Sequence, residues 1–248
     1  MLSARLKQKI RGFFIDISET ALSNILIKRK RFDVETIAHL LATVESAKLR
    51  LESMPAAQNL VTRFNLLDYA IKNVSIDGLW LEFGVYKGKS LKRIADQTAA
   101  AVFGFDSFEG LPKDWILSYR QGDFSLNGNA PEQLPSNVTL VKGLFAETLP
   151  EFLAKHDEPV AFLHIDCDLY SSTRTVLTEL QGRIKSGTII LFDEFFNFPQ
   201  WQKHEYRAFM DFIAETNYSY EYIGFASAYN SVAVRITGIP EQTAQPEI

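Results

Sequence analysis

The strongest constraint on the fold is an alternation of short apolar segments and helical patterns that begins near residue 78. The segments expected to form strands are 79–83, 101–105, 138–142, 160–166 and 188–193. Helical patterns lie between them at 89–99, 147–156 and 170–182. Strands that alternate with helices form parallel sheets whose two faces are covered by those helices. The sequence therefore predicts an α/β fold with a Rossmann-like, mostly parallel sheet.

The last part of the chain predicts an antiparallel addition to this sheet. After a helical pattern at 201–215, the segments "YSYEYIGF" and "AYNSVAVRI" are separated by a short link, which indicates an antiparallel pair at one edge. The break at 113–136, rich in Gly, Pro, Asn and Ser, is typical of a lid. The polar tail, residues 238–248, contains two prolines and is expected to be loose.

Residues 1–57 are predicted to form a helical extension in front of a domain that covers residues 58–237. The stretch "MLSARLKQKIRGFF" has apolar residues at helical spacing with basic residues between them. We expect it to pack on its own domain or on another subunit, as a cap or a homo-oligomer contact. Peripheral membrane contact through residues 1–14 is the alternative. "DVETIAHLLATVESAKLRLESM" and "AAQNLVTRFNLLDYAIKN" predict two further helices, the first capped by Asp33.

Composition and charge exclude several classes of function. The chain is 46% hydrophobic and 23% charged, which is ordinary for a globular protein. A net charge of −4 gives no reason to expect nucleic-acid binding, which needs clustered basic residues. A single cysteine rules out an internal disulfide. We expect a cytoplasmic protein, because no apolar run approaches the ~20 residues that span a bilayer and no secretory signal is present.

A turn with two glycines after the first expected strand points to a ligand. The segment 82–88, "EFGVYKG", has the pattern E-x-G-x-x-x-G. Glycines let a ligand approach the backbone, and the amides at the start of the following helix favour anionic or polar groups. The spacing differs from the G-x-G-x-x-G of dinucleotide enzymes, which makes a nucleotide-dependent oxidoreductase the weaker alternative.

The second expected strand ends in a carboxylate, Asp106. In doubly wound sheets an acid at this position accepts hydrogen bonds from ribose hydroxyls. The alternative is that Asp106 only caps the turn "DSFEGLP". A ribose-bearing cofactor that needs no pyrophosphate cradle is S-adenosylmethionine.

Two neighbouring strands each end in a pair of acids, Asp166 with Asp168 and Asp193 with Glu194. Carboxylates brought to one point raise one another's pKa, and a hard cation removes that penalty. Oxygen ligands fit Mg²⁺ or a similar divalent cation, which would also lower the pKa of an acceptor hydroxyl. Along the first of these strands, residues 166 and 168 are expected to point to the same face while Cys167 points away.

Five segments resemble the macrocin O-methyltransferase family in their order and spacing: "LEFGVYKGKSL", "VFGFDSFEGLP", "LVKGLFAETLP", "LHIDCDLYSST" and "IILFDEF". Members of that family are class I S-adenosylmethionine-dependent enzymes that methylate hydroxyls, notably on sugars, with a divalent metal. The resemblance covers roughly residues 60–236. It implies a seven-stranded sheet with an antiparallel last strand. It also implies a sugar hydroxyl of a glycoside or polysaccharide precursor as the acceptor, with a catechol-type phenol as the alternative.

The resemblance implies a role for each motif. The residues expected to bind S-adenosylmethionine, or its product S-adenosylhomocysteine, are Glu82, Gly84, Tyr86, Gly88, Ser90, Asp106, Ser107, Phe108, Gly143, Leu144, Phe145 and Asp166. The metal ligands would be Asp166, Asp193 and Glu194, of which Glu194 stands where the family usually has aspartate. Asp168 is the expected general base. Exchanged roles for Asp166 and Asp168, or a helix-capping role for Asp168, remain open.

Two histidines lie near these motifs. We expect His164, two residues before Asp166, to be a hydrogen-bonded core residue. His204 lies in "NFPQWQKHEYRAF", directly after the second acidic pair, and is the third candidate catalytic residue. Trp201, His204 and Glu205 are expected to border the acceptor pocket, with a position on the helix surface as the alternative.

Overall fold

The computed structural model describes residues 33–116 and 118–240. The chain divides into two units, residues 1–41 and 42–248. In the first unit, the described residues are Asp33 and the start of helix α2 (Val34–Ser53). Asp33 caps this helix as predicted, because its carboxylate accepts from the Glu35 amide and the Thr36 hydroxyl. The basic segment 1–14 and most of the predicted tail lie outside the described residues.

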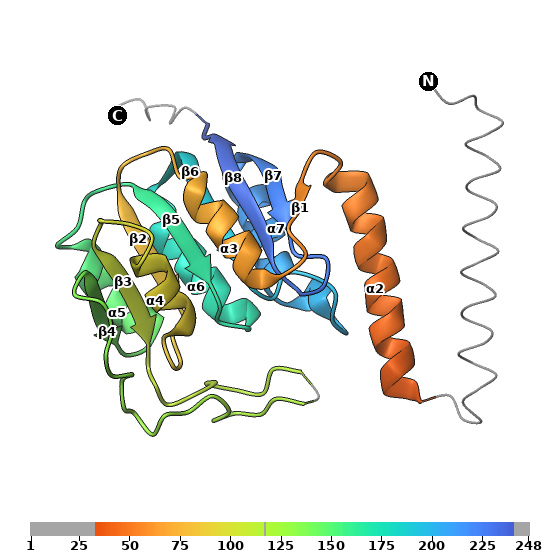
Figure 1. Cartoon of the computed structure of the whole chain (residues 1–248), viewed down its shortest axis with the longest axis horizontal. Helices are drawn as coiled ribbons and strands as arrows, with labels where there is room; N and C mark the ends of the chain where they lie inside the picture. The colour runs from red at the N-terminus through yellow and green to blue at the C-terminus, as the bar shows by residue number, and fades with distance from the viewer. Residues whose placement is uncertain (1–32, 117, 241–248) are drawn as a thin grey trace, which may run out of the picture. The chain divides into compact units, whose positions relative to one another are not determined.

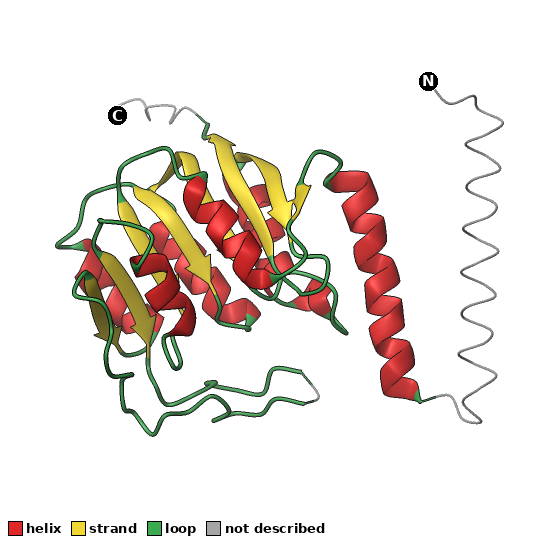
Figure 2. Cartoon of the chain, viewed as in Figure 1, coloured by secondary structure: helices red, strands yellow, loops and turns green. Residues whose placement is uncertain are grey.

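A mixed sheet forms the centre of the unit 42–248 (Figures 1 and 2). Its strand order is β1-β7-β8-β6-β5-β2-β3-β4. The strands are β1 (Gln58–Asn59), β2 (Leu79–Phe83), β3 (Val102–Asp106), β4 (Val138–Lys142), β5 (Val160–Ile165), β6 (Ile184–Phe192), β7 (Ser219–Phe225) and β8 (Val232–Gly238). Every neighbouring pair is parallel except those of β8, which is antiparallel to β6 and β7. The predicted mostly parallel sheet with an antiparallel last strand is confirmed.

The sheet has one strand more than predicted, and it lies where the sequence predicted the start of a helix. The two residues of β1 pair in parallel with β7. The helix that follows, α3 (Arg63–Lys72), begins only after Thr62, whose hydroxyl accepts from the Asn65 amide. Val61 just before it has a positive φ of 65°, which a helix cannot contain. The amphipathic pattern of this region correctly predicts a helix. The turn at Val61 and Thr62 decides where that helix starts.

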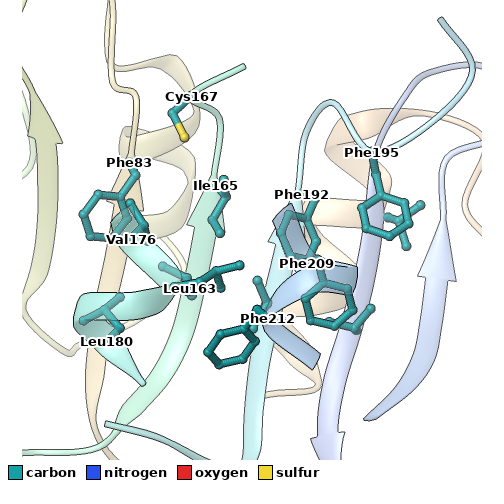
Figure 3. Packing of buried hydrophobic residues seen from close by; sticks show 14 of the residues in the cluster. Phe83, Leu163, Ile165, Cys167, Val176, Leu180, Phe192, Phe195, Phe209 and Phe212 are labelled. Atoms are coloured by element: carbon teal, nitrogen blue, oxygen red, sulfur yellow. The ribbon is translucent and has the colours of Figure 1, made fainter. Parts of the chain in front are cut away.

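Helices cover both faces of the sheet, as the alternation predicted. Besides α3, they are α4 (Lys89–Ala95), α5 (Phe145–Leu153), α6 (Tyr170–Leu180) and α7 (Glu205–Thr216), with a 3₁₀ turn, η1 (Trp201–Lys203). One core layer contains apolar residues of α5, α6 and α7, and the other contains those of α3 and α4. Figure 3 shows part of the first layer, in which Leu163 and Ile165 of β5 face Val176 and Leu180 of α6. Alternating side chains of β2 and β5 reach both layers, so these strands are buried at every residue.

The parallel strands β2, β3, β5 and β6 all end at one edge of the sheet, and the predicted motifs follow them there. The segment between β3 and β4 contains no helix or strand among its described residues, as the sequence indicated. No helix in the described part of the chain is both long enough and apolar enough to cross a bilayer. The site is positioned by the carboxyl edge that β2, β3, β5 and β6 share.

Candidate active site

The turn after β2 is tied to the end of β3 by the carboxylate of Asp106. Its Oδ2 accepts from the amides of Val85 and Tyr86, both at 2.8 Å, and its Oδ1 accepts from the amide of Phe108 at 2.7 Å. Asp106 therefore does cap the turn, as the alternative interpretation held. A carboxylate has about four acceptor positions, and three are used here. One remains for a ligand hydroxyl.

Gly84 and Gly88 are required by the protein's own backbone. Gly84 has a φ of 91°, and a Cβ atom there would lie 1.7 Å from the carbonyl oxygen of Asp166. Gly88 has a φ of 72° and is the N-cap of α4. The sequence interpretation attributed both glycines to a ligand that approaches the turn. The structure adds that Gly84 lets the turns after β2 and β5 pack together.

The other predicted cofactor residues fall into two groups. Ser90 and Phe108 are buried within the protein. Tyr86, Ser107, Gly143, Leu144 and Phe145 lie around the ends of β2, β3 and β4 and are only partly covered or exposed. The Gly143 amide donates to the Asp106 carbonyl at 3.1 Å, which places the Leu144 turn next to the Asp106 turn. Leu144 is 50% exposed, so its apolar side chain is free to cover a ligand held at Asp106.

Beneath this edge lies a buried ion pair between Glu82 and His164. Glu82 Oε1 is 2.8 Å from His164 Nδ1, and both side chains are almost completely buried. Burial lowers the pKa of His164, but the carboxylates of Asp193 and Glu82 outweigh it and raise that pKa to about 10. His164 is thus a hydrogen-bonded core residue, as expected, and an imidazolium cation below the acids.

The acids after β5 and β6 come together as predicted, but the backbone between them does not follow the predicted path. Strand β5 ends at Ile165, and Asp168 has a left-handed φ of 62°. The argument that residues 166 and 168 face the same way along one strand is therefore wrong. Their carboxylates meet because the chain turns. Cys167 between them is buried in the core (Figure 3).

Two groups of side chains bring ligand atoms within 4.8 Å of one another among the described residues. One consists of Asp166, Asp168 and Glu194, and the other of His164, Asp166 and Asp193. The first group offers only oxygen ligands, which hard divalent cations prefer. Glu194 Oε2 is buried and has no hydrogen-bond partner among the described residues, so a cation would satisfy it. No side-chain hydrogen bond caps α6, so the structure gives Asp168 no capping role.

Burial and mutual repulsion act on the acids in the same direction. Burial, followed by repulsion from Asp193, raises the pKa of Asp166 to about 7. The pKa of Asp168 is raised well above the usual range by burial and then by repulsion from Asp166. The pKa of Glu194 is raised well above its usual range by burial and then by repulsion from Asp193. So many buried carboxylates close together are unfavourable unless nearby cations neutralise them or some of them are protonated.

Sequence reasoning missed Arg63, the first residue of α3. Its Nη2 lies 3.1 Å from Asp166 Oδ2 and 2.9 Å from Asp193 Oδ2. The only signal in the sequence was a basic residue at a helix N-terminus, where the helix dipole disfavours a cation unless acids lie nearby. The sequence around Arg63 does not indicate which acids it contacts.

The helix after the second acidic pair contributes Glu205. Glu205 is fully buried, and its Oε2 accepts from the backbone amide of Glu194 at 3.0 Å. Trp201 is buried as well, so the helix-surface alternative is wrong for these two residues. His204 is half-buried, with its ring 6.1 Å from that of Trp115 and 5.9 Å from that of Phe198. Burial, with a smaller effect of Lys203, lowers the pKa of His204 to about 4.

A series of contacts between aromatic rings, here called the aromatic path, runs through the segment between β3 and β4. It connects His204 to the turn after β2. Trp115, which contacts His204, stacks on Tyr119 at 5.2 Å, and Tyr119 stacks on Phe124 at the same distance. Phe124 in turn meets the ring of Tyr86 edge-on at 5.7 Å. The segment between β3 and β4 therefore presents a continuous aromatic surface from the turn after β2 to the helix beyond the acids.

Comparison with known proteins decides which chemistry this edge belongs to. Residues 81–195 match the family described as "Methyltransferase domain". The segment that carries this edge is therefore similar to a methyltransferase domain. The matched residues include the turn after β2, Asp106 and both acidic pairs.

Similar enzymes include two O-methyltransferases from Streptomyces olivaceus and Micromonospora griseorubida. This methyltransferase is 22% identical over 214 residues to the 8-demethyl-8-(2,3-dimethoxy-alpha-L-rhamnosyl)-tetracenomycin-C 4'-O-methyltransferase of Streptomyces olivaceus, covering 75% of this chain and 80% of that protein. It is 25% identical over 234 residues to the mycinamicin III 3''-O-methyltransferase of Micromonospora griseorubida, covering 78% of this chain and 87% of that protein.

Solved structures share the fold. The crystal structure of the calicheamicin methyltransferase CalS11 matches with a TM-score of 0.56 and 21% identity, covering 84% of this chain and 94% of that chain. The O-methyltransferase NovP matches with a TM-score of 0.53 and 23% identity, covering 71% of this chain and 80% of that chain. The predicted class I fold and the predicted class of enzyme, an S-adenosylmethionine-dependent O-methyltransferase, are confirmed.

Proposed function

We propose that this methyltransferase transfers the methyl group of S-adenosylmethionine to a hydroxyl of a sugar, and that a divalent cation assists at the acid cluster. The observation that carries the proposal is the group formed by Asp166, Asp168 and Glu194 at the carboxyl ends of β5 and β6. It lies beside the turn after β2, since the Asp166 amide donates to the Phe83 carbonyl at 2.9 Å. The sugar acceptor is supported by the two relatives, whose names specify a rhamnosyl compound and mycinamicin III.

The cofactor would lie across the ends of β2, β3 and β4. Asp106 keeps one acceptor position for a ribose hydroxyl after it has bound three backbone amides. Leu144, exposed on the neighbouring turn, would cover the adenine. The methionine end would then point along β2 toward Gly84 and the acids of β5. Asp166 would then be the acid of the cluster that borders the cofactor.

The cation would be held by carboxylate oxygens of the cluster. Asp166 and Glu194 belong both to the ligands predicted from the sequence and to the group of three carboxylates that the structure brings together. The third ligand is Asp168 in that group and Asp193 in the predicted set. A bound divalent cation would lower the pKa of the acceptor hydroxyl and orient it. Asp168 is the proposed base that takes the hydroxyl proton. Holding oxygen, methyl carbon and sulfur in line provides much of the acceleration.

Calorimetric titration with S-adenosylhomocysteine, with and without Mg²⁺, tests the proposal on the wild type and on the variant Asp106→Ala. We expect the wild type to bind and the variant to lose most of its affinity, because the ribose hydroxyls lose their acceptor. Asp106→Asn is the matched control for the turn, since one amide oxygen still accepts from the backbone. No binding by the wild type under either condition would rule out the proposed function.

The acceptor class is tested by methyl transfer to a panel. The panel contains glycosides with free sugar hydroxyls, the same compounds without the sugar, and a catechol. We expect product only where a sugar hydroxyl is present. Transfer to the catechol alone would replace the sugar by a phenol as the acceptor.

A further inference from the structure

Arg63 reaches from the first turn of α3 into the acid cluster. Its Nη2 contacts Asp193 Oδ2 at 2.9 Å and Asp166 Oδ2 at 3.1 Å. Its Nη1 lies 3.4 Å from the Tyr229 hydroxyl, and its guanidinium carbon lies 5.3 Å from the ring centres of both Phe64 and Tyr229. One guanidinium nitrogen therefore forms ion pairs with the residues that directly follow two neighbouring strands, beside two aromatic rings.

The positive charge at this edge is scarce. The acids are Glu82, Asp166, Asp168, Asp193, Glu194 and Glu205. The cations among the described residues that contact them are Arg63 and His164. His164 is almost completely buried and lies 4.0 Å or less from both Glu82 and Asp193, so it has no room to leave. The Arg63 side chain is 26% exposed and is the one of the two that is able to move.

We propose that Arg63 is the resident counter-cation of the metal-free enzyme, which competes with a divalent cation for the oxygens of Asp166 and Asp193. The inference rests on the cation site of the proposed function. Two of the three predicted ligands are the carboxylates that Arg63 holds here. An oxygen bound by a guanidinium gives up part of that interaction when it ligates a metal. Arg63 thus offsets the negative charge of these two carboxylates without metal, and gives way to the metal when it binds.

The aromatic neighbours give the displaced side chain a place to go. Phe64 and Tyr229 lie against the guanidinium already, and such ring faces attract a cation. Arg63 is therefore able to keep ring contacts and gain solvent when it leaves the carboxylates, without being left in an apolar environment. A purely structural ion pair would behave differently, because its loss would disturb the carboxylates and weaken metal binding.

The test is a calorimetric titration of MgCl₂ into the metal-free wild type, Arg63→Gln and Arg93→Gln, followed by thermal unfolding of each. Arg93→Gln removes the same charge from a nearby helix, where Arg93 pairs with Asp68 at 2.6 Å and does not contact the cluster. We expect Arg63→Gln to bind Mg²⁺ about tenfold more tightly, which corresponds to ~1.4 kcal/mol. Without metal its Tm falls below that of the wild type, and Mg²⁺ restores most of the loss. Arg93→Gln leaves the affinity unchanged.

An affinity of Arg63→Gln for Mg²⁺ that is equal to or weaker than that of the wild type would overturn the inference. If Arg63→Gln does not fold without metal, Arg63→Lys replaces it, because a compact ammonium on a different stem does not bridge two carboxylates as a guanidinium does. Tighter Mg²⁺ binding by Arg63→Lys supports the inference, and equal binding overturns it. If no variant binds Mg²⁺ while S-adenosylhomocysteine still binds, the inference and the metal site fail together, but the methyltransferase function stands.

Discussion

His164 Nδ1 lies 2.8 Å from Glu82 Oε1, and this buried pair joins β5 to β2 directly beneath the acid cluster. The same imidazole is 4.0 Å from Asp193 at the end of β6. One ring therefore connects three neighbouring strands at the edge where the proposed chemistry takes place. The sequence interpretation expected a satisfied core histidine here, and the structure adds that its partners are the acids of two other motifs.

We predict that His164→Ala is strongly destabilising, because it leaves the buried carboxylate of Glu82 without its cation. Breaking a buried ion pair by removing one partner costs about 3–5 kcal/mol. Urea unfolding monitored by circular dichroism measures the change. Glu215→Ala is the control, since Glu215 pairs with Arg174 at the surface, where such a pair contributes at most about 1 kcal/mol. Equal losses in the two variants would contradict the prediction.

His204 is predicted to remain neutral at physiological pH. Burial lowers its pKa to about 4, against 6.5 for a solvated histidine. In the unfolded chain His204 takes up a proton near pH 6.5, whereas in the folded protein it does so only near pH 4. Its contribution to stability is therefore present above about pH 6.5 and is lost as the pH falls toward 4. NMR titration of the imidazole signal, assigned with His204→Gln, measures the midpoint directly.

Exposing His204 should reverse this shift. Trp115 covers one side of the ring, so Trp115→Ala is expected to raise the pKa of His204 toward 6.5. Tyr119→Ala is the matched control, because Tyr119 belongs to the same aromatic path and has no ring contact with His204. A midpoint near 6.5 in the wild type would show that burial does not control this group.

We predict that Glu205 stabilises the folded protein through its hydrogen bond and not through its charge. Its Oε2 accepts from the Glu194 amide, and the side chain is fully buried. Glu205→Gln retains an acceptor oxygen and removes one acid, so we expect unchanged or higher thermal stability without metal. Glu205→Ala leaves the Glu194 amide without an acceptor, which costs about 1–3 kcal/mol. Calorimetric scans compare the two, and a larger loss in Glu205→Gln than in Glu205→Ala would count against this account.

Gly84 is predicted to tolerate no side chain, because a Cβ atom would lie 1.7 Å from the Asp166 carbonyl oxygen. Gly122→Ala is the matched control, since its φ of 88° is similar but no atom lies within 4 Å of the added Cβ. The control carries only the backbone strain, about 1–2 kcal/mol. Gly84→Ala adds a backbone clash, so its loss in urea unfolding should exceed that of the control by several kcal/mol. Similar losses would mean that the turns after β2 and β5 move apart easily.

The sequence was sufficient for most of the helices and strands and for the edge at which the site lies. Apolar runs of strand length that alternate with helical patterns have few packing solutions, because each strand and helix must bury its apolar side against another element. The carboxyl ends of parallel strands share one edge, so the acids after 160–165 and 188–192 had to approach one another. Local rules were weaker at the turns. Val61 adopts a positive φ that β-branched residues rarely take, and Asp168 adopts one that aspartate takes more readily but that the strand pattern does not indicate.

Only the tertiary structure decided which side chains meet at that edge. Arg63 and Asp166 are 103 residues apart, and Glu82 and His164 are 82 apart. No periodicity relates such residues, since their contact depends on strand order, register and the position where α3 begins. The sequence by itself therefore determined the fold class, the acids and the class of enzyme. The folded chain determined which cations hold the acids, because a charge is balanced by whatever lies near it in space and not in sequence.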